Sequence, residues 1–224
     1  RLKGETVDEI VGMAKSMREH SLSIDVNTLP LLDTCGTGGS SRKVFNASTA
    51  AAFIASAAGA KVAKHGNRAM SSRSGSADLL EALGAVISLP PSAVAQCIEQ
   101  VGIGFLFAQS FHPSMKFAGP LRPQLGIRTI FNILGPLANP ARANCYVMGA
   151  PNKELAGKLA NSLARLEVRH ALVVSGEDGL DDFTITGSSN FYEVKGEQVV
   201  EKIITPEEVG LSRYSVQDII GGDP

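Results

Sequence analysis

The sequence predicts an α/β domain with a mostly parallel central sheet flanked by helices. Short, uniformly apolar strand candidates alternate with helical segments, and strands that are buried on both faces appear as such apolar runs. A glycine-rich loop joins one of these strands to a helix. The chain has 224 residues, of which 44% are hydrophobic and 19% charged, a composition typical of a globular protein that buries a core.

The first half of the chain alternates helices and strands. Thr6 and Glu9 have the spacing of a capping box, and apolar residues then recur at helical intervals. The elements expected are a helix at 6–20, a polar linker at 21–28, a strand at 29–34, a helix at 47–58, a strand at 61–64, helices at 76–83 and 92–101, and a strand at 104–108.

The second half opens on a proline-rich stretch. Residues 111–142 hold five of the 11 prolines, which predicts short helices and loops. Asn152 precedes a helix with leucines on one face. Strands are expected at 145–148, 171–174, 183–186, 191–194 and 198–204.

Charge and cysteine usage limit the function classes. The net charge of −1 gives no basic surplus for general nucleic-acid binding. Cys35, Cys97 and Cys145 are widely spaced and odd in number, which favours a reducing cytoplasm over a disulfide frame or a zinc site. Neither a signal peptide nor a membrane-spanning apolar run is expected. The chain begins at Arg1 and ends on a linker-like segment, so we expect a piece of a longer protein.

The glycine loop Asp33-Thr34-Cys35-Gly36-Thr37-Gly38-Gly39-Ser40-Ser41 lies between the strand at 29–34 and the helix at 47–58. Glycines let the backbone approach an anion closely, and a helix N-terminus favours negative charge, so the loop suits phosphate. It is not a Walker A motif, because no Gly-Lys-Ser/Thr follows at the required spacing, and it is not a dinucleotide fingerprint, because Ser41 stands where G-x-G-x-x-G requires glycine. A plain tight turn is the alternative.

An acidic loop leaves a later strand at the same expected sheet edge. The strand at 171–174 continues into Ser175-Gly176-Glu177-Asp178-Gly179-Leu180-Asp181-Asp182. Ligands of open parallel sheets bind outside the carboxyl ends of the strands. Carboxylates hold Mg²⁺, which bridges to phosphate oxygens. A solvated acidic turn is the alternative, but the nearby glycine loop favours the metal.

A third loop, 64–76, carries three cations, four serines and two glycines between a strand and a helix. These donors suit a polyanion, whereas the alternative is a polar loop with Ser76 as a helix cap. Ser48 and Thr49 suit either capping or phosphate binding. Arg122 is a carboxylate clamp or a solvated residue, and His112 by itself is more typical of a loop hydrogen bond than of catalysis. No G-x-S-x-G nucleophile elbow occurs. The combination predicts a Mg²⁺-phosphoryl or pyrophosphate ligand, with no covalent nucleophile and no redox cofactor.

Ordered motifs then point to a family. The chain resembles the anthranilate phosphoribosyltransferases over residues 1–224. The motifs that carry the resemblance are Asp33-x-x-Gly36-Thr37-Gly38-Gly39, Asn46-x-Ser48-Thr49, Lys64-His65-Gly66-Asn67-Arg68, Gly75-Ser76-Ala77-Asp78-Leu79-Leu80-Glu81-Ala82-Leu83-Gly84, Phe131-Asn132-x-Leu134-Gly135-Pro136-Leu137-x-Asn139-Pro140 and Gly176-x-Asp178-Gly179-Leu180-Asp181.

The resemblance implies an architecture. A small helical domain is hinged to a large α/β domain, so residues 1–28 would be part of the small domain plus a linker, and 29–224 the large domain. The segment at about 108–130 would supply hinges or small-domain helices, and the C-terminal part of the large domain would be missing. A cytoplasmic homodimer without membrane or nucleic-acid partners is implied for the full-length protein.

The resemblance also implies a reaction. Phosphoribose passes from phosphoribosyl pyrophosphate (PRPP) to the amine of anthranilate in tryptophan synthesis, with Mg²⁺ assisting the departure of pyrophosphate. PRPP would be held by Gly36, Gly38, Gly39, Ser40, Asn46, Ser48, Thr49, Lys64, Ser72 and Ser76. Anthranilate would face Gly36, Asn67, His112 and Arg122, and the metal would bind Ser48, Asp181 and Asp182.

Four positions depart from the family pattern. Ser40 replaces an Asp, Val44 replaces a Ser or Thr, Asp182 replaces a Glu, and Met115 stands where Tyr is frequent. Each lies in a motif that touches ligand or metal, so we expect effects on affinity and metal number rather than on the fold.

Two alternative functions are kept. The first is a pyrimidine nucleoside phosphorylase-like enzyme, against which Thr34-Cys35-Gly36 argues because that group uses Lys-His-Ser-Thr-Gly-Gly. The second is a non-catalytic, nucleic-acid-binding relative, against which the net charge argues.

Overall fold

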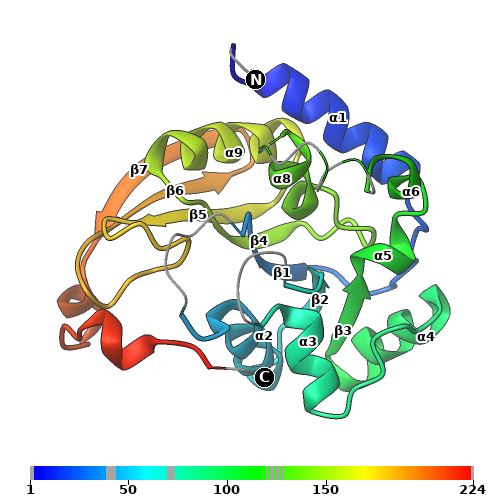
Figure 1. Ribbon diagram of the computed structural model, residues 1–224, viewed down its shortest axis with the longest axis horizontal. Helices are drawn as coiled ribbons and strands as arrows, with labels where there is room; N and C mark the ends of the chain where they lie inside the picture. Colours follow the sequence, from blue (N-terminus) through cyan, green and yellow to red (C-terminus); the bar gives the residue numbers. More distant parts are fainter. Residues whose placement is uncertain are drawn as a thin grey trace.

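The structure, a computed structural model, describes residues 3–38, 44–69, 74–119, 121, 124, 127 and 129–222. Its centre is one seven-stranded sheet in the order β3-β2-β1-β4-β5-β6-β7, running from β7 on the left of Figure 1 to β3 on the right. The strands are β1 (Leu31–Gly36), β2 (Lys61–Gly66), β3 (Ile103–Phe107), β4 (Cys145–Gly149), β5 (His170–Gly176), β6 (Ser189–Lys195) and β7 (Gln198–Ile204).

The sheet is mostly parallel, which confirms the predicted fold class. Strands β1 to β5 pair in parallel, whereas β6 and β7 form an antiparallel hairpin at one edge. The chain adds β2 and β3 on one side of β1 and then returns to place β4 on its other side. The strand order therefore reverses between β1 and β4, a topological switch point of the kind at which α/β sheets bind ligands.

Helices cover both faces of the sheet (Figure 1). On one face α9 packs against β5 and β6, and α1 lies against α9; on the other face α2 packs against β1 and β2. The longer helices are α1 (Val7–Glu19), α2 (Ala47–Ala57), α3 (Ser76–Ala82), α4 (Pro91–Gln96) and α9 (Lys153–Arg165).

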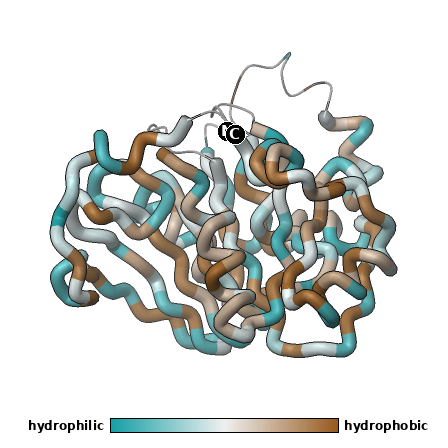
Figure 2. The backbone as a smooth tube through the Cα atoms, turned by 90° about the horizontal axis from the view of Figure 1, so that it is seen from below, coloured by the Kyte–Doolittle hydropathy of each residue, from teal (hydrophilic) through white to brown (hydrophobic). Residues whose placement is uncertain are grey.

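The hydrophobic core lies between the sheet and these helices. Leu159 and Leu163 of α9 are fully buried, as the leucine spacing predicts, and share one cluster with Ile10 and Ala14 of α1. A smaller cluster joins α3 to Phe107 of β3. Figure 2 shows hydrophobic segments running through the strands and helices of the interior. No helix in the described ranges is long and apolar enough to cross a membrane.

Short helices occupy the proline-rich stretch, as predicted. They are α6 (Met115–Ala118), α8 (Phe131–Leu134) and the 3₁₀ turn η2 (Gly135–Leu137), and α5 (Ala108–Phe111) leads into them. The C-terminal segment holds two more such turns, η3 (Pro206–Val209) and η4 (Val216–Ile219). After η4, Ile220 forms a bridge with Val44, so this segment lies beside the start of α2 (Figure 1).

Local signals set most boundaries. The capping box is present, because Glu9 N donates to Thr6 Oγ1 and Thr6 N donates to the Glu9 carboxylate. The strand expected at 29–34 is shifted to Leu31–Gly36. The helix expected at 92–101 begins as α4 and ends in a π-helical turn, η1 (Cys97–Val101).

The strand predicted at 183–186 is wrong. The structure has bends there, and β6 begins only at Ser189. The hydroxyls of Thr184 and Thr186 both donate to the carboxylate of Asp178, which folds the segment back on its own loop. Side-chain bonds of this kind compete with a strand ladder and are not visible in an apolar–polar pattern.

Candidate active site

The candidate site lies at the switch point, where the ends of β1 and β4 meet the loop that follows β5. Gly36 and Gly149 are paired in register at these ends, and Thr37 N donates to the Gly149 carbonyl at 3.1 Å. A Cβ on Gly149 would overlap the backbone oxygen of Asp181, and a Cβ on Gly36 would lie 3.1 Å from Asp181 Oδ2. The glycine loop and the acidic loop are thus in contact, as the shared sheet edge predicted.

Asp178 organises the acidic loop from within. Its carboxylate accepts hydrogen bonds from Thr184 Oγ1 at 2.8 Å, Thr186 Oγ1 at 2.6 Å and Leu180 N at 3.2 Å. These three hydrogen bonds stabilise the turn that contains Asp181 and Asp182. Sequence reasoning missed this role, although two threonines one residue apart, shortly after an acidic turn, are a signal for it.

The neighbouring carboxyl groups of Asp181 and Asp182 influence each other's protonation. Burial, followed by the adjacent charge of Asp181, raises the pKa of Asp182 to about 7, and Lys64 counteracts the rise. Two neighbouring carboxylates and one buried ammonium therefore influence one another's charge. A cation that approached the pair would favour its fully ionised form.

The donor set can be compared with what Mg²⁺ requires. Among the described residues no three His, Cys, Asp or Glu side chains gather into a cluster that could hold a metal by themselves. Mg²⁺ usually keeps several waters and takes one or two carboxylates plus substrate phosphate oxygens. The adjacent carboxylates of Asp181 and Asp182 match the number of carboxylates that Mg²⁺ usually takes.

Lys64 is buried beneath the first turn of α2. Its Nζ donates to the Thr34 carbonyl at 2.5 Å and to Ser48 Oγ at 3.3 Å. Only 2% of the residue is exposed, and burial lowers the pKa of Lys64 while the charges of Asp33, Cys35 and Asp182 oppose that change. Lys64 and Ser48, both predicted site residues, are therefore in direct contact.

The start of α2 is the candidate phosphate site. Asn46 is its N-cap residue and makes no side-chain cap bond to the helix backbone; its Oδ1 instead accepts from Thr49 Oγ1 at 2.8 Å. Ser48 and Thr49 lie within the first turn rather than capping it. Gly38 has a φ of +67°, a conformation that L side chains rarely adopt. Ala47 N donates to the Phe45 carbonyl and Thr49 N to the Asn46 carbonyl, so the positive end of the helix dipole is what favours an anion here.

The buried carboxylate of Asp33 in β1 is hydrogen-bonded to β2 and to Asn139. Asp33 has no exposed surface, and its two oxygens accept from Asn139 Nδ2 at 2.8 Å and from His65 N at 3.2 Å. Burial raises the pKa of Asp33 to about 6, opposed by Lys64 and by these hydrogen bonds. Asp33 and Asn139 belong to the quoted motifs, but sequence reasoning gave them no role.

Asn67 and His112, two of the residues predicted to face the second substrate, lie near the end of β2. His112 is buried, and its Nε2 lies 3.2 Å from Nε2 of His65. Asn67 is exposed, and its Oδ1 accepts from Gln109 Nε2 at 3.4 Å. Ser76 is the first residue of α3 rather than its cap, and its Oγ donates to the Asn67 carbonyl at 3.4 Å. Asn67, Ser76 and the histidine pair are thus grouped around one strand end.

One cation of the third loop is directed away from the site. Arg68 pairs with Asp78 and Glu81 of α3 and lies over the Phe107 ring, 5.6 Å from its centroid. Asp78 also accepts from the backbone N–H groups of Ala69 and Gly75. These contacts shape the loop, so Arg68 contributes to its structure rather than to the expected polyanion surface.

Several predictions fall outside the described residues. They concern Gly39, Ser40, Ser72 and Arg122. Of the other departures from the family pattern, Val44 forms the bridge with Ile220 and Met115 begins α6.

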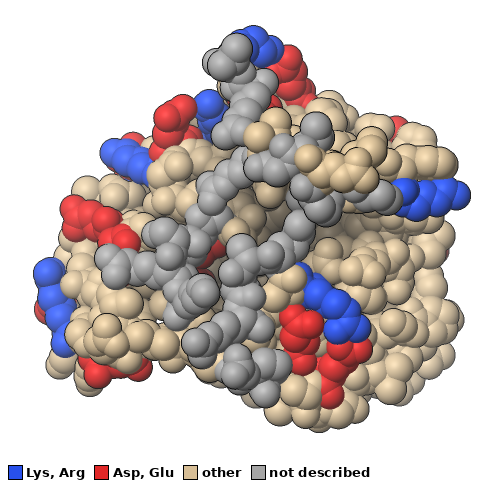
Figure 3. All heavy atoms as spheres, viewed as in Figure 1, with Lys and Arg blue, Asp and Glu red and all other residues tan. Residues whose placement is uncertain are grey.

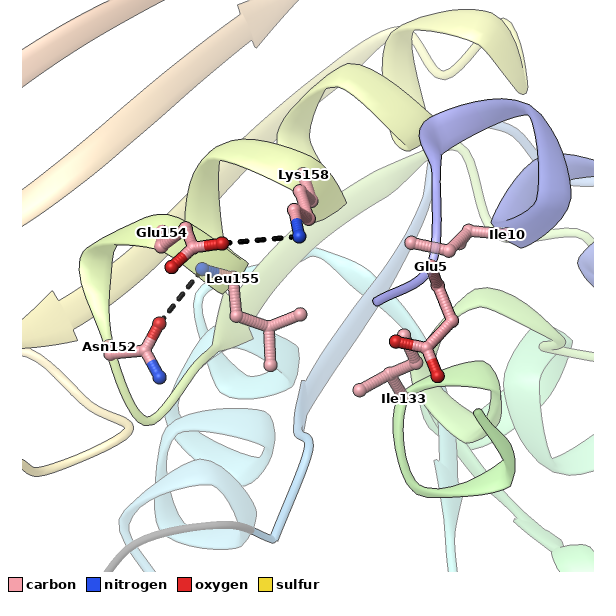
Figure 4. Close-up of a pocket in the computed structure, with 7 residues that line it drawn as sticks. All are labelled: Glu5, Ile10, Ile133, Asn152, Glu154, Leu155 and Lys158. Carbon is pink, nitrogen blue, oxygen red and sulfur yellow. Dashed lines mark hydrogen bonds and ion pairs between the residues drawn. The ribbon is translucent and has the colours of Figure 1, made fainter. Parts of the chain in front are cut away.

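A separate hollow of about 150 Å³ lies between the start of α1, α8 and the start of α9 (Figure 4). Its charged pair, Lys158 and Glu154, is 3.2 Å apart with most of the Glu154 side chain exposed, a geometry worth little energy. None of the predicted site residues lines it. The lining consists of Glu5, Ile10, Ile133, Asn152, Glu154, Leu155 and Lys158.

A family model described as "Glycosyl transferase family, a/b domain" matches residues 28–224. The chain belongs to this glycosyl transferase family. Among curated relatives, the anthranilate phosphoribosyltransferase of Chloroflexus aggregans is 53% identical to the chain over 223 residues, covering 99% of the chain and 65% of that protein. Against the enzyme of that name from Moorella thermoacetica the figures are 51%, 99% and 66%. The chain thus spans slightly less than two thirds of the length of these relatives.

Solved structures of similar proteins agree with this assignment. The anthranilate phosphoribosyltransferase of Thermus thermophilus matches the chain with a TM-score of 0.93 and 48% identity, covering 100% of this chain and 66% of that one. The enzyme of that name from Saccharomyces cerevisiae, in complex with PRPP and Mg, matches with a TM-score of 0.88 and 33% identity, covering 98% and 60%.

Proposed function

We propose that the full-length protein transfers phosphoribose from PRPP to the amine of anthranilate. The observation that carries the proposal is the contact at the switch point between the end of β1, at Gly36, and the acidic loop at Asp181. Lys64 and the first turn of α2 lie beside the same strand end. The hydrogen-bond donors proposed for phosphate and the acids proposed for the metal therefore lie close to the point at which α/β sheets bind ligands.

The phosphates of PRPP would bind at the start of α2. The helix dipole favours the anion there, and the buried Lys64 adds positive charge next to Ser48. Mg²⁺, when bound, neutralises pyrophosphate and assists its departure as a leaving group. The chain's part is to hold both substrates in place, which requires no protein nucleophile. The residues proposed to hold PRPP remain Gly36, Gly38, Gly39, Ser40, Asn46, Ser48, Thr49, Lys64, Ser72 and Ser76.

The acceptor substrate would bind near the end of β2. Asn67 contacts Gln109 there, His112 contacts His65, and the neighbouring strand β1 carries Gly36 of the glycine loop. Arg122 is proposed to pair with the anthranilate carboxylate, because a guanidinium matches a carboxylate with two parallel hydrogen bonds.

Anthranilate fluorescence tests the reaction directly. The full-length protein with PRPP, anthranilate and Mg²⁺ is expected to consume the fluorescence, and a chelator is expected to abolish the loss. Unchanged fluorescence with both substrates and metal present would refute the proposal. Thymidine phosphorolysis by the same protein would instead support the phosphorylase alternative.

Substitution of the two acids tests the metal site. Asp181→Asn and Asp182→Asn are each expected to weaken Mg²⁺-dependent PRPP binding in calorimetry, while thermal stability is maintained because one of two repelling carboxylates is gone. Asp25→Asn, at an exposed position of the linker, is the matched control. If PRPP binding still depended on Mg²⁺ in both site variants, the two acids would be interpreted as part of a solvated turn and not as metal ligands.

The nucleic-acid alternative gains no support. On the face drawn in Figure 3, the described charged side chains of both signs are scattered over a mostly uncharged surface, with no extended basic area. Binding to a phosphate backbone requires clustered cations.

The wider organisation is also proposed. Residues 1–28 would belong to a small helical domain with its linker, and 29–224, including a hinge segment at about 108–130, to the large domain; the family model, which begins at residue 28, supports this division. A cytoplasmic location fits the cysteines, all three of which are free thiols. A homodimer is expected of the full-length protein, and light scattering tests it.

A further inference from the structure

Strands β1 and β2 lose their pairing before either strand ends. Within the described ranges, the register between them stops at the pair Leu32–Val62. Beyond this pair, β1 remains paired with β4 as far as Gly36, and β2 remains paired with β3 as far as Gly66. Both strands are therefore intact, and only the ladder of hydrogen bonds between them is interrupted. The interruption immediately precedes the two strand ends that belong to the candidate site.

Side chains bond to the backbone groups in this interrupted stretch. Asn139 Nδ2 donates to the Ala63 carbonyl at 2.8 Å, and the His65 N–H donates to Asp33 Oδ1 at 3.2 Å. In a continuous parallel ladder, such carbonyl and N–H groups bond to the backbone of the neighbouring strand. A buried backbone group without a partner is costly, so these side chains stabilise the interruption by taking the place of the missing ladder partners.

The amide of Asn139 links the two strands across the interruption. Asn139 has no exposed surface, and its Nδ2 donates to Asp33 Oδ2 of β1 at 2.8 Å as well as to Ala63 of β2. Its Oδ1 accepts from the Ala141 N–H at 2.9 Å, which fixes the orientation of the amide because a backbone N–H only donates. A buried amide that is bonded on both sides has little freedom to move, so it holds the two strands at one separation.

The strand ends beyond the interruption carry groups proposed for different substrates. β1 leads into Gly36 of the glycine loop, where PRPP would bind, and β2 leads to Asn67, which would face the acceptor. Lys64 Nζ donates to the Thr34 carbonyl across the same interruption. Transfer between two bound substrates requires the reacting atoms to lie about 3–3.5 Å apart. The separation of these strand ends therefore bears directly on the rate of transfer.

We propose that Asn139 is a positioning residue: through its hydrogen bonds to Asp33 and Ala63 it keeps β1 and β2 apart and sets the distance between the PRPP and acceptor subsites. The inference rests on the proposed function, because that function supplies the two substrates. Each subsite keeps its own binding groups when the separation changes. A lost Asn139 amide is therefore expected to slow transfer while each substrate still binds.

Kinetics and binding of the full-length protein test this difference. Asn139→Leu keeps the approximate size of the side chain and removes all of its hydrogen bonds. Its kcat is expected to fall about ten- to hundredfold, the effect of a misplacement of about 1 Å. The Kd values of PRPP with Mg²⁺ and of anthranilate, each measured by calorimetry, are expected to stay nearly unchanged, and the binding stoichiometry counts the folded sites. The matched control Asn161→Leu removes an amide bond to the Gly157 carbonyl in α9 and is expected to keep kcat.

An exchange of the two side chains tests the same contact in case Asn139→Leu does not fold. Asp33→Asn alone either sets two amide donors against each other or turns a donor toward the His65 N–H, so kcat is expected to fall. Adding Asn139→Asp places an acceptor opposite the new amide. The double variant Asp33→Asn/Asn139→Asp is therefore expected to recover much of the lost kcat, and no recovery relative to Asp33→Asn would overturn the proposal.

The other outcomes separate positioning from stability and from the proposed function. An unchanged kcat per folded site in Asn139→Leu, or a loss explained entirely by weaker PRPP binding, would overturn the proposal. A crystal structure of the ligand-free double variant and of Asp33→Asn tests the geometry without the reaction: the strand separation beyond Leu32–Val62 is expected to change in Asp33→Asn and to be restored in the double variant, and an identical separation in all would overturn the proposal. If the wild type transferred no phosphoribose, the proposed function and the effect on kcat would both fail, and the crystal structures would still decide whether Asn139 sets the separation.

Discussion

Buried polar side chains at the ends of β1 and β2 give the candidate site its charge. Asp33 and Lys64 are both almost fully buried, and each counteracts the effect of burial on the pKa of the other. Burying one such charge alone would be costly, whereas a nearby opposite charge with hydrogen bonds offsets much of the penalty. Substituting either residue is therefore expected to change the pKa of the other.

The raised pKa of Asp33 predicts a pH effect on stability. A folded-state pKa of about 6 against 3.8 means that the folded protein binds the proton more tightly, so the contribution of Asp33 to stability is greatest below pH 4 and is lost as the pH rises through 6. The unfolding free energy of the wild type minus that of Asp33→Asn is expected to fall by up to about 3 kcal/mol between pH 4 and pH 7. Urea unfolding across this range measures it, with exposed Asp25→Asn as control. A difference independent of pH would contradict the assignment.

Arg122 gives a prediction about substrate recognition. Arg122→Lys replaces a planar fork by a point charge, so the KM of anthranilate is expected to rise, while that of PRPP stays nearly unchanged. Loss of a charge-assisted pair costs about 1.5–3 kcal/mol, roughly ten- to hundredfold. Arg122→Ala is expected to be worse. Steady-state kinetics of the full-length protein measures both KM values, with Arg213→Lys as control at an exposed ion pair. Equal loss for both substrates would indicate a structural or solvated Arg122.

At the scale of elements, the acidic loop after β5 is held by its own side chains. The three bonds to Asp178 lie within nine residues, and the loop touches the sheet at Gly149 and Gly36. The positions of Asp181 and Asp182 therefore depend on these three hydrogen bonds to Asp178, which we call the Asp178 clasp, rather than on the helices around the sheet.

Removing one hydroxyl of this clasp is expected to affect both stability and ligand binding. Thr186→Val keeps the side-chain shape and deletes a bond to a charged group, which typically costs about 1.5–3 kcal/mol. We also expect PRPP affinity in Mg²⁺ to fall, because the acids are no longer held in place. Thr205→Val removes a similar hydroxyl–carboxylate contact, to Glu208 in an exposed turn, and is expected to leave PRPP binding unchanged. Calorimetry that gave equal affinities for both variants would assign the clasp to stability only.

At the scale of the whole molecule, the site depends on strand order. Gly36 of β1 and Gly149 of β4 are paired in register although 113 positions separate them in the chain. The two strands are neighbours because the chain, after adding β2 and β3 on one side of β1, returns to add β4 on the other side. The loop after β5 then reaches over both strand ends. Glycine at 149 leaves the space that this close approach requires.

Gly149→Ala tests that close approach. The added methyl group would meet the Asp181 backbone, and overpacking of this kind costs about 1–3 kcal/mol. The variant is expected to unfold at lower temperature and to bind PRPP more weakly in the presence of Mg²⁺. Gly12→Ala in α1 is the matched control: its methyl group enters open space, so a gain of about 0.5–1 kcal/mol is expected. Similar effects of the two substitutions on calorimetric unfolding would contradict the close approach.

Residue patterns alone determined the fold class and most of its elements. The leucine spacing of α9 and the capping box of α1 are local signals, so a single segment suffices to predict them. The glycine and acidic loops were likewise visible, because glycine and paired carboxylates are specialised residue types. Where a local pattern was ambiguous, at 183–186, the prediction failed.

Only the tertiary structure decided which side chains meet. Asp33 with Asn139, His65 with His112, and Asp181 with Gly36 are pairs separated by 47 to 145 positions in the chain. Strand order and helix packing create such contacts, and no periodicity in the sequence records them. The pKa shifts of Asp33 and Asp182 follow from burial, which is a property of the folded surface. The contacts and pKa shifts of the site could therefore be inferred only from the folded structure, in which the sheet brings these strand ends together.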